Sequence, residues 1–216
     1  MRITLFGSTG NVGQLFIEKA LRDGHEVVAY ARSPKKIQLT HERLTIIPGE
    51  LTDAVSIDAA VAGADVVVSV MGPNGYQDAL IFAPAYRLII AAMKAHHVKR
   101  LIALGTPTIR DSSDRFNIIF FALIHIVRLI INKGSEDIAT VGTLVRDSGL
   151  DYTLVRIPLL YEGESAPVRV GAFGNGIWWP FVSRESFTDF LIAQLTDTHY
   201  VRRVIAIANQ GTVKSV

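Results

Sequence analysis

The fold of this chain is decided by residues 2–13, Arg2-Ile3-Thr4-Leu5-Phe6-Gly7-Ser8-Thr9-Gly10-Asn11-Val12-Gly13. A short apolar run ends in a turn with three glycines, and the helical spacing of apolar residues starts directly after it. Glycines let the backbone approach a phosphate group, whose charge is then stabilised by unpaired N–H groups and the helix dipole. The first two glycines are spaced one residue wider than in the dinucleotide fingerprint Gly-x-Gly-x-x-Gly. Residues 7–13 are predicted to bind nucleotide phosphates; the alternative is a glycine-rich turn without a ligand.

The rest of the chain alternates between two apolar patterns. Short runs rich in β-branched residues indicate strands buried on both faces, as in parallel sheets covered by helices. Between them, apolar residues recur at helical spacing. This order predicts an α/β fold, a Rossmann-type doubly wound parallel sheet with right-handed crossovers. The predicted strands are residues 3–6, 26–31, 44–47, 66–70, 101–104 and 152–155, and the predicted helices are residues 12–22, 55–61, 79–96 and 136–147.

The C-terminal part of the sequence is less regular. Ser135, followed by two acids, has the chemistry of a helix N-cap, and Gly149 that of a helix end. Residues 159–182 are rich in glycine and are expected to form a substrate-side loop. A helix near residues 185–195 and a strand near residues 204–207 complete a small C-terminal appendage over residues 159–216. No linker divides the chain, so one domain is expected over residues 1–216.

Composition excludes several classes of protein. The 216 residues hold 22 Lys and Arg against 20 Asp and Glu, a net charge of +2, so no nucleic-acid partner is expected. With 49% hydrophobic and 19% charged residues, the chain is not disordered. It has no cysteine, and no histidine has an acid at ligand spacing, so no metal site is predicted. The apolar run that starts the sequence is too short for a signal peptide, and a cytoplasmic location is expected.

Residues 116–131 form the most apolar segment of the sequence. Their uninterrupted apolar core ends at His125, whereas a membrane span needs about 20 predominantly apolar residues. No membrane span is therefore predicted. A helix that is apolar all round is either buried or packs on a partner. We expect a homodimer contact or the wall of a lipophilic pocket at this segment.

The end of the second predicted strand indicates which nicotinamide cofactor would bind. An acid about 20 residues after the glycines bonds the ribose 2′-hydroxyl in NAD-binding versions of this fold. Here Arg32 and Ser33 stand in that region, and Lys35 and Lys36 follow. Cationic side chains suit the 2′-phosphate of NADP, so NADP(H) is predicted in preference to NAD(H).

Four motifs in register resemble the atypical short-chain dehydrogenase/reductases. They are residues 7–13, residues 31–33, residues 49–53 and the run Ser148-Gly-Leu-Asp-Tyr-Thr-Leu-Val-Arg156-Ile-Pro158. Within that superfamily the chain is most similar to the NADPH-dependent flavin reductase and biliverdin-IXβ reductase branch, and to the NmrA-like NADP-binding proteins. The resemblance covers roughly residues 2–195.

The resemblance implies a role for residues at several predicted strand ends, where ligands of open α/β sheets bind. Gly7, Ser8, Thr9, Gly10, Asn11, Val12 and Gly13 would form the pyrophosphate site, and Arg32 and Ser33 the 2′-phosphate site. Glu50 and Leu51 would flank the adenine. Val70, Met71 and Gly72 would edge the ribose. Thr106 would lie beside the nicotinamide as the candidate catalytic residue, and Pro158 and Leu159 would cover the other side of the ring.

The sequence also restricts the chemistry. Most members of the superfamily donate a proton from a Tyr with a Lys four residues later, and none of the six tyrosines here has that lysine. Reduction of a simple ketone needs such an acid. Flavins, quinones and conjugated tetrapyrroles delocalise the incoming charge, so orientation in an apolar slot supplies most of the rate. The candidate walls of that substrate pocket are Pro73, Tyr76, Phe116, Trp178 and Trp179, each of which could instead be ordinary packing.

The hypothesis from sequence is an NADPH-dependent oxidoreductase that passes hydride to a flavin, quinone or similar planar acceptor. The alternative from another class is a non-catalytic regulator that senses NADP(H) and signals through a partner surface. The missing Tyr/Lys pair and the apolar segment favour this alternative. An epimerase or dehydratase that acts on a nucleotide sugar is a third possibility. It is disfavoured because such an enzyme would ordinarily need the same tyrosine with its lysine four residues later.

Overall fold

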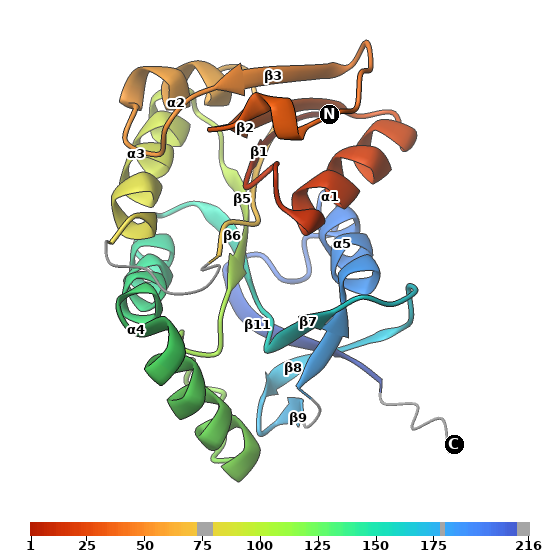
Figure 1. Ribbon diagram of the computed structural model, residues 1–216. Coiled ribbons are helices and arrows are strands. Elements are labelled where there is room, and N and C mark those ends of the chain that lie inside the picture. Colours follow the sequence, from red (N-terminus) through yellow and green to blue (C-terminus); the bar gives the residue numbers. More distant parts are fainter. Residues whose placement is uncertain (73–79, 178–179, 211–216) are drawn as a thin grey trace.

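One mixed sheet runs through the middle of the molecule, with helices on both of its faces (Figure 1). The computed structural model describes residues 1–72, 80–177 and 180–210, with the backbone alone at residues 123 and 127–135. The strands are β1 (Arg2–Phe6), β2 (Glu26–Ala31), β3 (Leu44–Pro48), β4 (Val66–Ser69), β5 (Arg100–Gly105), β6 (Asp151–Arg156), β7 (Leu159–Tyr161), β8 (Val168–Phe173), β9 (Gly176–Ile177), β10 (Phe181–Ser183) and β11 (Arg203–Asn209). The helices are α1 (Asn11–Arg22), η1 (Pro34–Lys36), α2 (Ala54–Val61), α3 (Phe82–Ala95), α4 (Ile118–Arg146) and α5 (Arg184–Ala193).

The order of the strands fixes where a ligand can bind. Among the described residues, nine strands form the sheet in the order β3-β2-β1-β4-β5-β6-β11-β8-β9, and β10 and β7 form a separate pair. All neighbours from β3 to β11 are parallel, whereas β8 is antiparallel to β11. The order reverses at β1, which has β2 on one side and β4 on the other. In open α/β sheets the carboxyl end of the strand at such a reversal is where ligands bind. The predicted Rossmann-type fold is confirmed.

Helices cover the sheet because its strands are apolar on both faces. In β1, Ile3 and Leu5 pack toward α1 and α5, and Phe6 packs toward α2 and α3. Figure 1 shows α1 and α5 on one face and α2, α3 and α4 on the other. The fully buried strand residues place the carboxyl ends of the strands in fixed positions, and the loops that follow these ends carry the candidate site.

The predicted start of the fourth helix is wrong. The helix does not begin at Ser135 but at Ile118, and it continues without a break to Arg146. Asn117 is its N-cap, because Asn117 Oδ1 accepts hydrogen bonds from the backbone N–H of Ile119 (2.9 Å) and Phe120 (3.2 Å). A serine with acids behind it is a common helix start, but the apolar residues before it continue the helix here.

The substrate-side segment also differs from the prediction. The segment expected to be a loop contains β7, β8, β9 and β10, and β8 pairs with β11 so that Val170 lies opposite Ile207. The strands are short and interrupted by glycines, which weakens the alternation of apolar and polar residues that identifies a strand. The residues expected to form a small appendage therefore supply β11 and β8 to the main sheet, and α5 to the layer beside α1.

Asp137 links two helices of one layer. It lies buried in α4, and its carboxylate accepts hydrogen bonds from the backbone N–H of Ile81, Phe82 and Ala83, each at 2.7 Å. These N–H groups belong to the start of α3, whose own N-cap residue makes no side-chain hydrogen bond. A carboxylate at this position satisfies unpaired donors and interacts favourably with the helix dipole. Asp137 was predicted to serve its own helix and instead caps its neighbour.

Replacing Asp137 by Ala is expected to lower the free energy of unfolding by about 2 to 3 kcal/mol, because buried N–H groups lose their acceptor. Urea unfolding followed by circular dichroism measures this loss. Asp147→Ala is the matched control, because Asp147 is an exposed acid at the end of the same helix. We expect that control to change the free energy by less than about 0.5 kcal/mol. Equal effects of the two substitutions would show that Asp137 does not cap α3.

Candidate cofactor and active site

The glycine turn after β1 brings two strand ends into contact. Gly7 has φ +85°, and a Cβ atom at Gly7 would lie 3.0 Å from the backbone nitrogen of Met71, which follows β4. A Cβ atom at Gly13 would lie 2.3 Å from the carbonyl oxygen of Gly7. The positive φ and the tight contact disfavour a side chain at Gly7, and a side chain at Gly13 would clash with the backbone of the turn. Gly7 therefore allows the turn to pack on the loop after β4, and Gly13 allows the start of α1 to pack on the turn.

The start of α1 can accept an anion. Gly10 is the N-cap residue, no side chain caps the helix, and its first turn contains no acid. Gly10 and Asn11 are exposed, so the first N–H groups of this helix are available for a phosphate. Thr9 is held in place by Gln14, whose Nε2 donates to the carbonyl oxygen of Thr9 at 3.1 Å. This cradle fits the pyrophosphate of a dinucleotide.

Ser8, which the resemblance assigned to the pyrophosphate site, turns its side chain away from it. The Ser8 hydroxyl is fully buried and donates to the carbonyl oxygen of Tyr30 at 2.7 Å. Val12 and Gly13 are buried as well. These three residues therefore shape the turn, while Thr9, Gly10 and Asn11 form its accessible surface.

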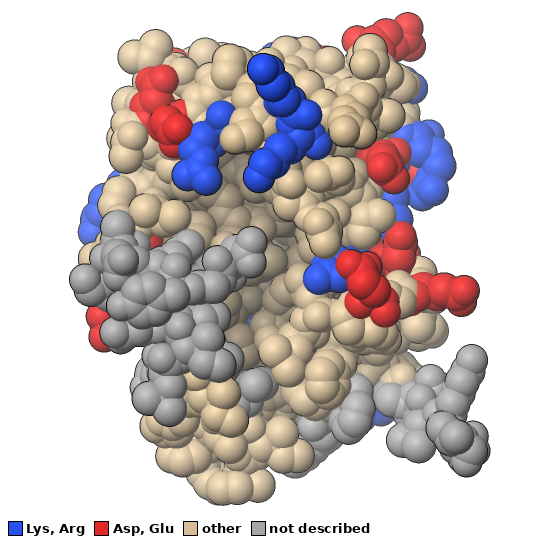
Figure 2. All heavy atoms as spheres, viewed as in Figure 1, with Lys and Arg blue, Asp and Glu red and all other residues tan. Residues whose placement is uncertain are grey.

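The carboxyl end of β2 is basic. Arg32 is exposed directly after this strand, Ser33 is partly buried, and Lys35 and Lys36 follow in η1. Within the described part of the chain, neither Arg32 nor these two lysines form an ion pair. Figure 2 shows Lys and Arg side chains gathered above a hollow in the middle of the face that it views. A cationic rim of this kind suits a phosphate group.

Tyr30 positions the loop after β3, which carries the predicted adenine residues, and the sequence analysis missed this role. Its hydroxyl donates to the carbonyl oxygen of Glu50 at 2.7 Å, and its backbone carbonyl accepts from Ser8. Burial and the nearby acids Asp53 and Glu50 raise the pKa of Tyr30 to about 12, so the hydroxyl stays protonated and able to donate. One residue of β2 thus joins the loop after β1 to the loop after β3. A tyrosine in an otherwise aliphatic strand is the signal that could have indicated this.

The predicted adenine residues lie on the loop after β3 and the predicted ribose residues on the loop after β4, and β2 and β1 separate these two strands in the sheet. Glu50 is exposed, and Leu51 is partly buried against the core, so the pair offers an acid and an apolar side chain. Val70 follows β4, and its backbone N–H donates to the carbonyl oxygen of Phe6 at 3.0 Å. Met71 is buried next to the glycine turn. Gly72 ends the described residues of this loop.

Thr106 and Pro158 lie at the ends of two adjacent parallel strands. Gly105 of β5 is in register with Arg156 of β6, and the carbonyl oxygen of Gly105 accepts from the backbone N–H of Ile157 at 3.0 Å. Thr106 is partly buried, and its hydroxyl lies 2.7 Å from that of Thr108. Pro158 is buried, and Leu159 is partly buried in β7. From β3 to β6 in the order of the sheet, the predicted cofactor residues therefore lie at the carboxyl ends of the parallel strands.

Only one predicted wall of the acceptor pocket lies within the described residues. Pro73, Tyr76, Trp178 and Trp179 fall outside them. Phe116 lies just before α4 and lines a cavity of about 260 Å³. Pro107, the residue after Thr106, also lines this cavity. Phe116 therefore lies near the segment that carries Thr106, in a cavity lined by the loop between β5 and α4 and by the first turns of α4.

A buried ion pair fixes the loop between β5 and α4. The guanidinium of Arg156 is fully buried and forms two hydrogen bonds to Asp114, at 2.6 and 2.8 Å, and one to the carbonyl oxygen of Ile109 at 2.9 Å. It also lies 4.7 Å from the ring centre of Phe173. Asp114 in turn accepts from the backbone N–H of Phe173 at 3.1 Å. A buried guanidinium needs such a bidentate partner. The pair joins the loop after Thr106 to β6 and β8.

Two further observations concern ions and membranes. Among the described residues, no three His, Asp or Glu side chains come together in a way that could hold a metal ion. In the same part of the chain, every helix is too short or too polar to cross a lipid bilayer.

Solved structures show the same fold. A short-chain dehydrogenase/reductase from Veillonella parvula DSM 2008, determined in complex with NADP, is 22% identical with a TM-score of 0.80 over 98% of this chain and 95% of that chain. An anaerobillin reductase from Escherichia coli O157:H7 is 20% identical with a TM-score of 0.77 over 97% of each chain. These similarities confirm the predicted fold.

Curated relatives match in sequence. The isoflavone reductase homolog IRL of Zea mays is 33% identical over 108 residues, 46% of this chain and 33% of that protein. A probable pinoresinol-lariciresinol reductase 3 of Arabidopsis thaliana is 23% identical over 235 residues, 100% of this chain and 70% of that protein. The chain spans about a third of the length of most of the curated relatives it matches.

A family described as NAD(P)H-binding has a sequence profile that matches residues 7–198. The matched range begins at the glycine turn and contains every strand end from β2 to β6 that the predicted cofactor residues follow. Because the profile covers most of the chain, this protein is a member of the NAD(P)H-binding family.

Proposed function

We propose that this protein is an NADPH-dependent oxidoreductase that transfers hydride to a flavin, quinone or similar planar acceptor. The observation that carries the proposal is the continuous edge of the sheet from Arg32 at β2, through the glycine turn, to Thr106 at β5. This edge offers a cationic group for a 2′-phosphate at one end and a hydroxyl for the reacting ring at the other. Several matched relatives are named as reductases, which supports the same reaction class.

The preference for NADPH rests on charge. Arg32 stands where an acid would bond the ribose 2′-hydroxyl of NAD, and within the described residues it has no acidic partner that would neutralise it. The guanidinium can form two parallel hydrogen bonds to a phosphate. Lys35 and Lys36 of η1 add positive charge beside it. An acid at the position of Arg32 would instead repel the phosphate.

A planar acceptor is favoured because the chain lacks the usual proton donor of the superfamily. The chain has no Tyr-x-x-x-Lys pair, so a proton for a developing alkoxide has no such donor. When NADPH is bound, it supplies the hydride, and a conjugated acceptor spreads the resulting negative charge until a proton arrives from water. Thr106 contributes a hydroxyl that can orient the bound ring, and Pro158 and Leu159 contribute the apolar surface on the other side.

A second function is a non-catalytic sensor of NADP(H). The exposed apolar residues at the start of α4 favour it, because they offer a surface through which a cofactor-dependent signal could reach a partner. The two functions differ in one measurable respect: the sensor binds NADPH and does not oxidise it.

Arg32→Glu is expected to reverse the cofactor preference. The substitution replaces attraction by repulsion at the 2′-phosphate, so the Kd for NADPH should rise by about 10- to 100-fold while the Kd for NADH changes little. Fluorescence titration with both cofactors measures the ratio. Arg22→Glu makes the same change of charge on an exposed residue at the far end of α1 and serves as control. An unchanged ratio in Arg32→Glu would remove Arg32 from the 2′-phosphate site.

Thr106→Val is expected to lower kcat by about tenfold with little change in NADPH affinity, because the variant keeps the shape and loses the hydroxyl that orients the ring. Thr106→Ser keeps the hydroxyl and should recover most of the activity. Steady-state kinetics of both variants separates the two effects. If both variants lose activity equally, the methyl group and the packing matter rather than the hydroxyl.

The acceptor class is tested by following NADPH oxidation with FMN, with a simple quinone and with a small aldehyde. Turnover with FMN or the quinone and none with the aldehyde is the expected result. Turnover with the aldehyde alone would contradict a planar acceptor. Tight NADPH binding without turnover on any of the three would favour the sensor.

A further inference from the structure

The start of α4 presents an apolar face to solvent. In Figure 1 this end of the helix extends beyond the last strands of the sheet. On the face that Figure 2 views, the described residues at the lowest point of the molecule, where this end lies, show neither acidic nor basic side chains. The exposed fractions of its large side chains are 78% for Phe116, 65% for Ile118, 51% for Ile119, 46% for Phe121 and 53% for Ile126.

The helix periodicity shows that this face is continuous. At about 100° per residue, residues 118, 119, 121, 122, 125 and 126 lie on one side of the helix, and all of them are exposed. Phe120 lies on the opposite side, where it is buried against Phe173 at a ring-centre distance of 4.6 Å. The outer side of a helix in a globular protein normally carries charged residues. Here it carries Ile, Phe, Ala and one His.

The charges beside this face are basic. Arg110 and Arg115 are exposed, and neither forms an ion pair within the described part of the chain. Of the neighbouring acids, Asp114 is paired with the buried Arg156. Asp111 keeps its negative charge, accepts hydrogen bonds from the backbone N–H and hydroxyl of Ser113, and lies close enough to Arg146 to interact with that charge. From residue 115 to residue 135 the sequence has Arg115, Arg128 and Lys133 and no acid.

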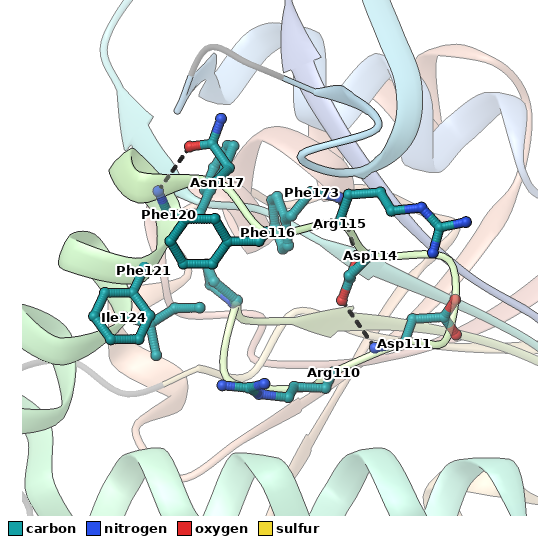
Figure 3. Close-up of a pocket in the computed structure, with 11 residues that line it drawn as sticks. Arg110, Asp111, Asp114, Arg115, Phe116, Asn117, Phe120, Phe121, Ile124 and Phe173 are labelled. Atoms are coloured by element: carbon teal, nitrogen blue, oxygen red, sulfur yellow. Dashed lines mark hydrogen bonds between the residues drawn. The ribbon is translucent and has the colours of Figure 1, made fainter.

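Next to the face lies a cavity with two kinds of wall. It has a volume of about 260 Å³. Figure 3 shows the rings of Phe116, Phe120 and Phe121 with Ile124 on the α4 side, and Asp111, Asp114 and Arg115 on the loop side. A cavity that is apolar on one side and charged on the other matches an amphiphilic molecule, whose tail and headgroup need different surroundings.

We propose that the start of α4 docks this protein on an anionic lipid surface. The exposed side of residues 116–126 enters the boundary between headgroups and acyl chains, and Arg110 and Arg115 contact headgroup phosphates. An amphipathic helix lying in the interface needs an apolar face and flanking cations, but not the length of a membrane span. This agrees with the finding that no described helix could cross a bilayer. The inference is independent of the proposed hydride transfer.

A second copy of the chain fits this face less well. In a two-fold symmetric contact this patch meets its own copy, so Arg110 and Arg115 of both chains would be brought together. Only Asp111 of each chain would compensate them, because Asp114 is paired with Arg156. Anionic lipid provides the opposite charge. The homodimer expected from the sequence through residues 116–131 stays a prediction and is an outcome of the test below.

The test is sedimentation of the full chain with vesicles of phosphatidylcholine alone and of phosphatidylcholine with about 30% phosphatidylglycerol. We expect binding to the anionic vesicles to be stronger by about tenfold or more, and to weaken as salt is added. Ile119→Ser with Ile126→Ser should abolish binding to both kinds of vesicle. Arg115→Glu should weaken binding to the anionic vesicles alone.

The matched control is Leu39→Ser with Val55→Ser, which removes two exposed apolar side chains elsewhere on the surface and should leave vesicle binding unchanged. NADPH titration of each variant confirms that it has folded. The proposal is overturned if the wild type binds neither vesicle, or if the α4 double variant binds as the wild type does. It is also overturned if the wild type forms a concentration-dependent dimer that the α4 double variant loses while neither binds vesicles.

Discussion

The close approach of Gly7 to the backbone of Met71 is the contact on which the candidate site depends. It exists because β1 and β4 are neighbours in the sheet and because Gly7 has no side chain to separate the loops that follow them. Moving these loops apart would carry the start of α1 away from the residues after β4. The phosphate cradle and the ribose edge would then no longer face one ligand. One position whose backbone conformation favours glycine therefore sets the geometry of a surface built from six strand ends.

Buried polar side chains hold the loops around this contact. Ser8 and Tyr30 join the loops after β1 and β3, and Arg156 with Asp114 holds the loop after β5 against β8. Each bond satisfies a buried donor or acceptor that would otherwise destabilise the fold. These residues fix backbone positions and leave the accessible surface to others. Ser8 belongs to the residues that fix the backbone, so its hydroxyl bonds to Tyr30 and is not offered to a phosphate, although Ser8 lies inside the glycine turn.

The sequence was sufficient for the parallel core of the fold and insufficient for its C-terminal part. Strands such as β1 and β4 are apolar on both faces and lie next to turns of recognisable chemistry, so their existence and order could be predicted. The start of α4 at Ile118, with Asn117 as its N-cap, could not be predicted, because the apolar segment that follows Asn117 also resembles a separate buried helix. Asp137 could not be assigned to α3, because the contact joins residues more than fifty positions apart. The same limit applies to the partners of Tyr30 and Arg156. Spacing along a chain carries no information on contacts that tertiary packing alone creates.

The position of β11 has a consequence for how the protein is made. Among the strands of the described residues β11 is the last in the sequence, yet it lies inside the sheet between β6 and β8. During synthesis, β6 and β8 emerge from the ribosome before the strand that separates them. Until β11 arrives, each has an open edge with unpaired N–H and C=O groups, the kind of edge that pairs with other chains. A nascent chain of this protein therefore passes through a stage in which these two strand edges are exposed to pairing with other chains until β11 fills the place between them.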